Sequence, residues 1–303
     1  MEKEYWVSMS DHTEVFLKKW FNTDIKPKAI VQLSHGMVEH IQRYQDFAMF
    51  LLENNIFVYG NDHRGHGNTG ERQGQLGYFA TENGFAKTAH DLHEITKIIK
   101  ADYPETPLFL FAHSMGSFLA RHYIQNHSND IDGLILSGTG FFPRITHLTA
   151  KTLASMLPAQ KESNLMNTLA FGNYNRKIAN RKTNFDWLTR DHGAVTKYMD
   201  DPYAGYIPTS RFFYDLMDGL GRIHKNQFNE NIRKDLPILL ISGDADPVGN
   251  YAKGVWKVAK NYEKIGLHNI TVHLFNDARH ELLHEVNKKE VYSTIYEWLV
   301  KHL

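Results

Sequence analysis

Short apolar runs alternate with longer mixed stretches along most of the chain. The apolar runs predict buried strands at 28–34, 56–59, 107–112, 131–136, 236–242 and 269–275, after two opening strands at 5–9 and 15–21. The stretches between the runs predict helices at 44–54, 85–99, 117–126, 251–263 and 288–302. This alternation indicates an α/β fold, in which helices cover both faces of a mostly parallel sheet.

Two segments depart from the alternation. Residues 68–80 are polar and rich in glycine, so we expect a loop there. Residues 141–208 contain short apolar clusters in place of strands, and this pattern predicts a mostly helical insertion. We expect the insertion to form a cap over a core made of residues 1–140 and 209–303. A chain of 303 residues fits one large α/β domain of this kind.

The composition excludes several classes of protein. The 34 basic and 34 acidic residues balance, so the chain has no net positive charge with which to attract nucleic acid. Cysteine is absent, which excludes disulfides and thiolate metal sites. No apolar run approaches the roughly 18–20 residues of a membrane span, and the N-terminus lacks a secretory signal. We therefore expect a soluble, cytoplasmic protein, whose oligomeric state the sequence does not determine.

A serine lies between the strand predicted at 107–112 and the helix that follows it. The local pattern is small-x-Ser-x-Gly, formed by Ala112, Ser114 and Gly116. A serine on a sharp strand-to-helix turn is a nucleophile elbow, and small neighbours are needed because a larger side chain would collide with the adjacent backbone. Alanine is the smallest step from glycine, so we interpret Ala112 as a tolerated variant of the motif.

Polar clusters follow three other predicted strands, at His35-Gly36-Met37, Gly243-Asp244-Ala245-Asp246 and Ala278-Arg279-His280. Functional side chains of a parallel sheet gather at the carboxyl ends of its strands. A nucleophilic serine needs a histidine base, and the base needs a carboxylate that orients it. Ser114, an aspartate at 244 or 246 and His280 occur in the chain order that α/β-hydrolases use.

Four motifs together resemble the monoacylglycerol lipase/lysophospholipase group of α/β-hydrolases. They are His35-Gly36-x-x-Glu39-His40-x-x-Arg43-Tyr44, Asp62-x-x-Gly65-His66-Gly67, His113-Ser114-Met115-Gly116 and the Gly-x-x-Asp loop that ends at Asp246. The resemblance implies that Ser114 is the nucleophile, His280 the base and Asp246 its partner. It also implies an oxyanion hole formed by the backbone N–H groups of Met37 and Met115. The sequence departs from the group at Ala112 and at Thr69, where serine is frequent.

Other polar residues near these motifs have a structural interpretation. His113 is expected to point away from the nucleophile and to pack as a hydrogen-bonded histidine. Two further groups are expected to hold loops beside the site: Asp62, His63, Arg64 and His66 in one, and Glu39, His40, Arg43 and Tyr44, which would support the oxyanion loop, in the other.

Residues 280–284 also match H-E-x-x-H, the zinc-binding helix of metalloproteases. In that motif His280 and His284 would bind the metal and Glu281 would act as the base. A third ligand is required, and the extended downstream glycine–histidine pattern is absent. The string is better explained by a catalytic histidine that follows a strand, so we predict no metal and no cofactor.

The sequence therefore predicts a serine hydrolase that cleaves carboxylic esters through an acyl-enzyme. The apolar content of the cap suggests an apolar acyl chain, with Leu153 and Met166 as candidate substrate contacts, and allows transient contact of the cap with a membrane surface. One alternative is a ligand-binding protein without turnover. The other is an aminopeptidase of the same fold, which would need an acidic anchor for the substrate amine. The cap offers four candidates: Asp186, Asp191, Asp200 and Asp201.

Overall fold

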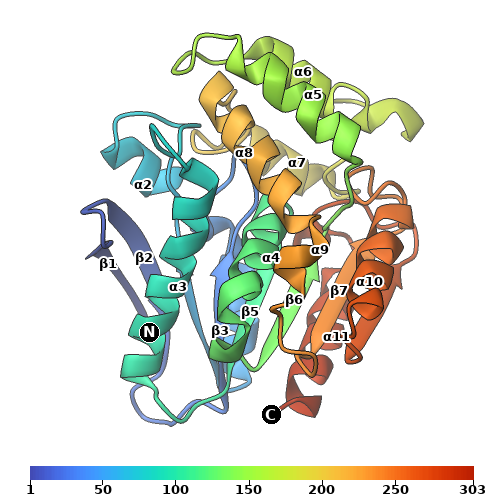
Figure 1. Cartoon of the computed structure of the whole chain (residues 1–303). Coiled ribbons are helices and arrows are strands. Elements are labelled where there is room, and N and C mark those ends of the chain that lie inside the picture. The colour runs from blue at the N-terminus through green and yellow to red at the C-terminus, as the bar shows by residue number, and fades with distance from the viewer.

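The computed structural model describes residues 1–303 and has an eight-stranded sheet at its centre (Figure 1). The strand order is β1-β2-β4-β3-β5-β6-β7-β8. The strands are β1 (Glu2–Ser8), β2 (Glu14–Trp20), β3 (Ala29–Ser34), β4 (Ile56–Asn61), β5 (Leu108–His113), β6 (Gly133–Ser137), β7 (Ile238–Gly243) and β8 (Ile270–Phe275). Every predicted strand is present, and the α/β fold class is confirmed.

Only β2 runs against the direction of the other strands. β1 pairs antiparallel with β2, and β2 pairs antiparallel with β4, whereas β4, β3, β5, β6, β7 and β8 are all parallel. After β3 the chain moves to β4 on one side and then crosses to β5 on the other. A parallel sheet opens a crevice at such a reversal of strand order, outside the carboxyl ends of the two strands.

The core lies on both faces of the sheet because successive side chains of a strand point to opposite faces. In β5, for example, Leu108, Leu110 and Ala112 pack in one hydrophobic cluster, and Phe109 and Phe111 pack in the other. All five are almost fully buried. A strand that is covered on both faces is apolar throughout, which is why these strands appeared as continuous apolar runs.

Helices cover the two faces unequally. One face packs against α3 (Gly84–Asp102), α4 (Met115–His127), α8 (Ser210–Ile223) and α10 (Lys253–Lys264). The other face packs against α1 (Gln45–Glu53) and α11 (Lys288–Lys301). No helix of the structure combines the length and apolar character that crossing a bilayer would require.

The segment between β6 and α8 forms the cap at the top of Figure 1. It contains α5 (Arg144–Ser155), α6 (Asn164–Phe171), a 3₁₀ turn at Tyr174–Lys177 and α7 (His192–Asp200), so the predicted helical insertion is confirmed. Its division from the core at 141 and 208 stays a prediction, because α8 contacts both α5 and the core helices α3 and α4.

The prediction of a loop at 68–80 is wrong for its first residues. Residues 67–72 form the short helix α2 (Gly67–Arg72). Glycine at 67 and 70 disfavours a helix on propensity alone, but Asp62 accepts hydrogen bonds from the backbone and side-chain nitrogens of Asn68, at 2.8 and 3.0 Å. A carboxylate at a helix N-terminus satisfies donors that have no partner inside the helix. This contact outweighs the weak helix propensity of the two glycines.

Candidate active site

The turn after β5 places Ser114 at the N-terminus of α4. Its backbone is strained, with φ 50° and ψ −118°, and it orients a partly exposed side chain above the sheet. A Cβ at Gly116 would collide with the carbonyl oxygen of Ser34. Ala112 is fully buried within β5 and pairs in register with Leu136. The elbow therefore requires glycine after the serine, and its strand accommodates alanine before it.

Three side chains from three loops meet at this turn. His280 Nε2 lies 2.8 Å from Ser114 Oγ, and His280 Nδ1 lies 3.0 Å from Asp246 Oδ2. Asp246 and His280 are both buried. The serine hydroxyl, the imidazole and the carboxylate thus form one continuous hydrogen-bonded chain, in which the imidazole can accept the hydroxyl proton.

The structure separates the two aspartates that the sequence left in competition. Asp246 faces His280 and also accepts a 2.8 Å hydrogen bond from the Val248 N–H. Asp244 accepts a hydrogen bond from the Asp277 N–H at 2.8 Å, so it links the two loops that follow β7 and β8. Only Asp246 is in position to orient the imidazole.

The electrostatic surroundings favour a proton on His280. Burial alone would lower the pKa of His280, because a charged ring is poorly solvated in the interior. The Asp246 carboxylate opposes this effect by charge and by its hydrogen bond, and Glu281 and Glu39 add to it, so the pKa of His280 is raised above its ordinary 6.5. An imidazolium at this position would thereby be stabilised.

The two backbone N–H groups predicted to form the oxyanion hole are those of Met37 and Met115. Met115 is the first residue of α4, so its N–H has no partner inside the helix, and the Met37 N–H donates to no protein acceptor. The loop that carries Met37 turns sharply, since Val38 has φ 50°. A Cβ at Gly36 would come within 2.6 Å of Glu39 Oε1. The close packing of this loop explains why glycine stands at position 36.

A buried ionic network holds the oxyanion loop against the histidine loop. Glu39 accepts hydrogen bonds from the Gly36 N–H at 2.5 Å and from Arg43 Nη1 at 2.6 Å. Arg43 also donates two 2.7 Å bonds to Glu281, the neighbour of His280. Burial would raise the pKa of the Glu281 carboxyl, but Arg43 outweighs that effect and lowers it to about 2. The predicted supporting role of Glu39 and Arg43 is visible in these contacts.

The loop at 62–66 holds neighbouring loops in place, as the sequence predicted. Asp62 Oδ1 accepts a 2.8 Å hydrogen bond from the Ile41 N–H, beside the oxyanion loop. Arg64 bonds to Asp91 and Asp11, and His63 donates its backbone N–H to His35 Nε2 at 2.9 Å. None of these side chains lines the cavity beside Ser114.

The cap is linked to the same loops. His40 Nε2 lies 2.7 Å from Asp201, which follows α7, and the Tyr198 ring of α7 packs over the Arg43 guanidinium at 4.7 Å. The backbone N–H groups of His280 and Glu281 donate to cap carbonyls. A displacement of the cap would therefore be transmitted to both the oxyanion loop and the histidine loop.

The expectation that His113 points away from the site is wrong. Its ring lies 4.7 Å from that of His280 and lines the cavity. The expected hydrogen bond is present, since Nδ1 lies 3.4 Å from Ser137 Oγ. Burial, and then the nearby His280, lower the pKa of His113 to about 4. The ring is therefore neutral at physiological pH and supports the base by packing.

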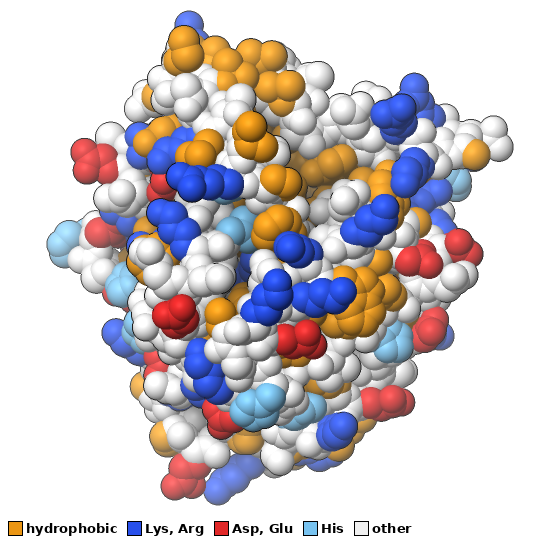
Figure 2. Space-filling model, turned by 45° about the vertical axis from the view of Figure 1, so that its right-hand side comes forward, with side chains coloured by type: hydrophobic (Ala, Val, Ile, Leu, Met, Phe, Trp, Pro, Cys, Tyr) orange, Lys and Arg blue, Asp and Glu red, His pale blue; other side chains and the backbone are white.

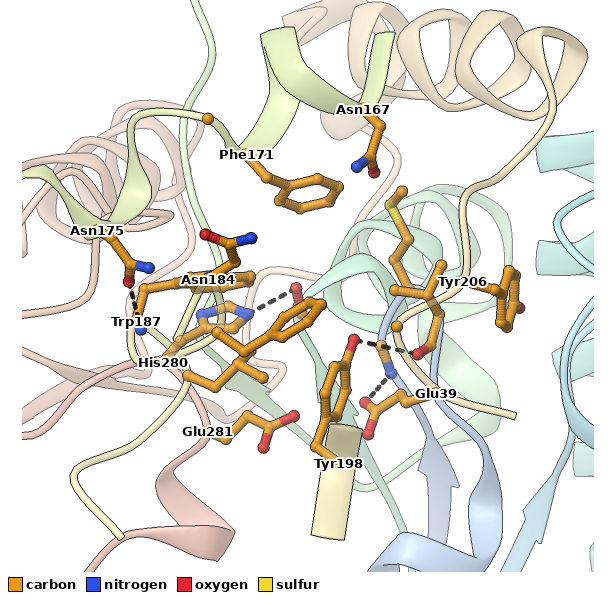
Figure 3. A pocket seen from close by; sticks show the side chains of 18 of the residues that line it. Glu39, Asn167, Phe171, Asn175, Asn184, Trp187, Tyr198, Tyr206, His280 and Glu281 are labelled. Atoms are coloured by element: carbon orange, nitrogen blue, oxygen red, sulfur yellow. Dashed lines mark hydrogen bonds between the residues drawn. The ribbon is translucent and has the colours of Figure 1, made fainter. Parts of the chain in front are cut away.

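Ser114 lines two cavities, the first of which is shown in Figure 3. One, of about 330 Å³, is mixed in character and is lined by polar side chains from the cap, including Asn167, Asn175 and Asn184. The other, of about 500 Å³, is apolar, with 17 hydrophobic residues among its 21 lining residues. Leu153 and Met166, the predicted substrate contacts, both lie in the apolar cavity.

Several residues of the mixed cavity were missed from the sequence. Trp187 packs 5.1 Å from the His280 ring, and Phe171 packs against Trp187 at 5.8 Å. Tyr198 and Tyr206 line the opposite side. The aromatic clusters of the cap indicated packing, but no spacing along the chain could place them over a histidine about 90 residues away.

The H-E-x-x-H string does not form a zinc-binding helix. Residues 282–284 make a single 3₁₀ turn, so His280 and His284 do not share a helical face. Both nitrogens of His280 face Ser114 and Asp246, and Glu281 is held by Arg43. The three residues of the motif therefore have separate positions and separate partners.

The acidic anchors proposed for an aminopeptidase lie elsewhere. Asp186 is buried and accepts hydrogen bonds from the Lys182 and Thr183 N–H groups, Asp191 caps α7, and Asp201 binds His40. None of these, nor Asp200, lines either cavity beside Ser114. The carboxylates that do line the mixed cavity, Glu39 and Glu281, are both paired with Arg43.

Comparison with known sequences identifies the family of the chain. The family model described as serine aminopeptidase, S33, matches residues 25–287. The chain belongs to this family of α/β-hydrolases. Rat monoglyceride lipase is 27% identical to the chain, covering 92% of the chain and 87% of the rat protein. Monoacylglycerol lipase of Mycolicibacterium smegmatis is 25% identical, covering 92% and 91%.

A solved structure agrees with this chain in fold and length. The highly thermostable carboxyl esterase of Bacillus coagulans, in complex with glycerol, superposes with a TM-score of 0.91 at 29% identity and covers 99% of this chain and 98% of its own. The predicted resemblance is thus confirmed. Although the family description names aminopeptidases, the relatives from rat and Mycolicibacterium smegmatis are named as lipases, which supports an ester hydrolase.

Proposed function

We propose that the chain hydrolyses the carboxylic ester of an apolar acyl chain, of the monoacylglycerol or lysophospholipid type. The observation that carries the proposal is the junction of an apolar and a mixed cavity at Ser114 Oγ. A monoacylglycerol has the same division, with a hydrocarbon chain on one side of the ester carbon and a polar alcohol on the other. The relatives named as monoglyceride lipases support this substrate class.

In the proposed reaction Ser114 Oγ attacks the ester carbonyl while His280 Nε2 accepts its proton. The carbonyl oxygen becomes an oxyanion, to which the Met37 and Met115 N–H groups donate; removing one such donor costs about 10²–10³ in rate in other enzymes. His280 then gives this proton to the ester oxygen of the leaving group as its bond to the acyl carbon breaks, and the alcohol leaves through the mixed cavity. Water activated by His280 releases the fatty acid, and no metal or cofactor takes part.

The acyl-chain assignment predicts how cap variants select substrates. Met166 lies in the apolar cavity and is 2% exposed, so Met166→Ser should penalise long acyl esters more than short ones. Each buried methylene contributes up to about 0.8 kcal/mol, so the loss should grow with chain length. The measurement is kcat/KM across an acyl series of dispersed p-nitrophenyl esters, and Leu153→Ser should give the same trend.

Leu165 provides the matched control, because it neighbours Met166 on α6 but is 49% exposed and lies outside the cavity. Leu165→Ser should leave the chain-length profile unchanged. If Met166→Ser and Leu165→Ser lowered all esters by the same factor, the cavity would not hold the acyl chain, and these residues would only stabilise the cap.

The aminopeptidase alternative predicts a different profile. It requires a free carboxylate in the cavity, and the two that line it, Glu39 and Glu281, are both paired with Arg43. We therefore expect no hydrolysis of aminoacyl amides by the protein that cleaves monoacylglycerols. Preference for an aminoacyl amide in the same assay would contradict the ester proposal.

Contact of the cap with a membrane surface is part of the proposal. Exposed hydrophobic side chains gather on α5 and α6, at the top of Figure 2. They are between 46% and 78% exposed and comprise Ile145, Leu148, Met156, Leu165 and Leu169. An apolar patch of this kind indicates an interaction site, and it lies beside the apolar cavity, which Ile145 and Leu169 also line. Cytoplasmic localisation stays a prediction.

Vesicle binding tests this contact. Met156 and Leu165 lie outside the apolar cavity, so Met156→Glu with Leu165→Glu should reduce partition into phosphatidylcholine vesicles at least about tenfold, since burying each side chain contributes roughly 1.5–3 kcal/mol. Val300→Glu with Leu303→Glu adds the same charge to exposed positions at the C-terminus and should bind as the native protein does. Equal partition of both double variants would contradict a membrane-facing cap.

A further inference from the structure

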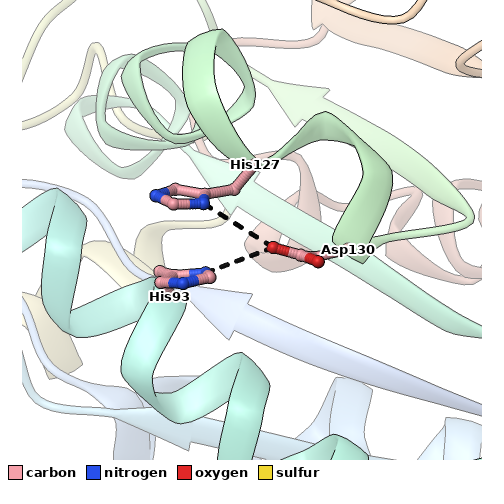
Figure 4. A group of neighbouring side chains, drawn as sticks. All are labelled: His93, His127 and Asp130. Carbon is pink, nitrogen blue, oxygen red and sulfur yellow. Dashed lines mark ion pairs between the residues drawn. The ribbon is translucent and has the colours of Figure 1, made fainter.

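A cluster of two histidines and an aspartate lies at the far end of α4 from Ser114. His127 is the last residue of α4, Asp130 lies in the 3₁₀ turn that follows, and His93 faces them from α3 (Figure 4). At about 1.5 Å per helical residue, the cluster is about 20 Å from the nucleophile. It has no part in the proposed reaction.

The three side chains have the spacing of metal ligands. His93 Nδ1 lies 3.3 Å and His127 Nδ1 lies 3.6 Å from Asp130 Oδ2, and the three donor atoms lie within 4.8 Å of one another. Ligands about 2.0–2.2 Å from a tetrahedral zinc ion lie about 3.3–3.6 Å apart. The two measured edges of the donor triangle match that separation.

An unsatisfied buried atom points into the cluster. His93 is only 8% exposed, and its Nδ1 makes no hydrogen bond although Asp130 Oδ2 is close. Buried polar atoms are nearly always paired, and an exception indicates a missing partner such as an ion. The His93 and His127 rings stack at 3.5 Å and 13°, so one ring must turn to direct its lone pair at an ion.

We propose that His93, His127 and Asp130 bind a divalent transition-metal ion, with Zn²⁺ as the best match to two imidazole nitrogens and one carboxylate oxygen. Mg²⁺ and Ca²⁺ prefer oxygen ligands throughout and are disfavoured here. Water completes the coordination at this partly exposed surface. The bound ion would link α3 to the end of α4 and stabilise the fold, in contrast to the sequence prediction of no metal.

The test is zinc titration of the full-length protein, with thermal unfolding as a second readout. Metal-free protein should bind one Zn²⁺ at this site, and Zn²⁺ should raise its Tm by several degrees because it binds only the folded state. His127→Gln should weaken that binding by at least about tenfold, as loss of even an indirect ligand contact costs 10–100-fold. Asp130→Asn should do the same, and ester hydrolysis in zinc-free buffer shows that both variants fold.

His90→Gln is the matched control. His90 is exposed on α3, the helix that carries His93, and lies outside the donor triangle. It should keep the native affinity and the zinc-dependent rise in Tm. The proposal is overturned if Zn²⁺ leaves the Tm of the native protein unchanged. It is equally overturned if His90→Gln and His127→Gln weaken zinc binding alike, which would mean that zinc binds surface histidines without selection.

Discussion

Ser114→Ala is expected to abolish ester hydrolysis, with a loss of up to about 10⁶ in turnover. Its Oγ lies 2.8 Å from His280 Nε2 and forms the junction of both cavities, so no neighbouring atom can replace it as nucleophile. The variant should also fail to react with a fluorophosphonate probe, which labels only an activated serine. The measurements are kcat with a short p-nitrophenyl ester and labelling followed by mass spectrometry.

Ser117→Ala is the control for this experiment. Ser117 lies one turn further along α4, and its buried hydroxyl donates to the Ser114 carbonyl oxygen. Its loss should affect stability but leave the probe reaction intact. If Ser114→Ala retained more than about a tenth of the native rate while folded, the nucleophile would be elsewhere. An unlabelled native protein would instead support a ligand-binding protein without turnover.

Asp246→Asn is expected to cost about 10⁴ in kcat, by analogy with the aspartate of serine proteases. An asparagine in place of Asp246 would remove the charge that stabilises the imidazolium, and its amide could hold His280 in the wrong tautomer. Asp244→Asn is the matched control, since Asp244 binds the Asp277 N–H and does not face the imidazole. A larger loss in Asp244→Asn than in Asp246→Asn would reverse the choice between them.

The pH profile gives an independent readout of the same contact. His280 must be neutral to accept the serine proton, and its pKa is raised, so kcat/KM of the native protein should rise with pH through a value above 6.5. Asp246 is the main group that raises this pKa, against the effect of burial. The residual activity of Asp246→Asn should therefore rise at a lower pH. An unchanged profile would show that Asp246 does not set the charge of His280.

The order of strands and helices was determined by the sequence alone. A buried parallel strand is a continuous apolar run, and an amphipathic helix repeats every three to four residues, so both are specified by neighbours along the chain. The elbow is equally local, because it needs only small residues two positions on either side of Ser114. The prediction from local pattern failed at α2, because a hydrogen bond to Asp62 outweighs the low helix propensity of Gly67 and Gly70.

The pairing of side chains from distant loops was decided only by the tertiary structure. Asp244 and Asp246 are of the same residue type two positions apart, and only the folded loops after β7 and β8 place Asp246 against His280 and Asp244 against the Asp277 N–H. The bridge that Arg43 makes between Glu39 and Glu281 likewise joins loops that are far apart in sequence. The orientation of the His113 ring toward His280 was also decided by the tertiary structure.

The direction of the His280 pKa shift shows most clearly what the sequence leaves open and the tertiary structure decides. Burial and a nearby carboxylate act in opposite directions on an imidazole, and the sequence allows both. Which effect is larger depends on distances and solvent exposure, here 3.0 Å to Asp246 and a ring with almost no exposure. The sequence by itself therefore determined the chemical groups and their order, and the folded structure determined their contacts and charge, because Coulomb interaction and desolvation depend on positions in space.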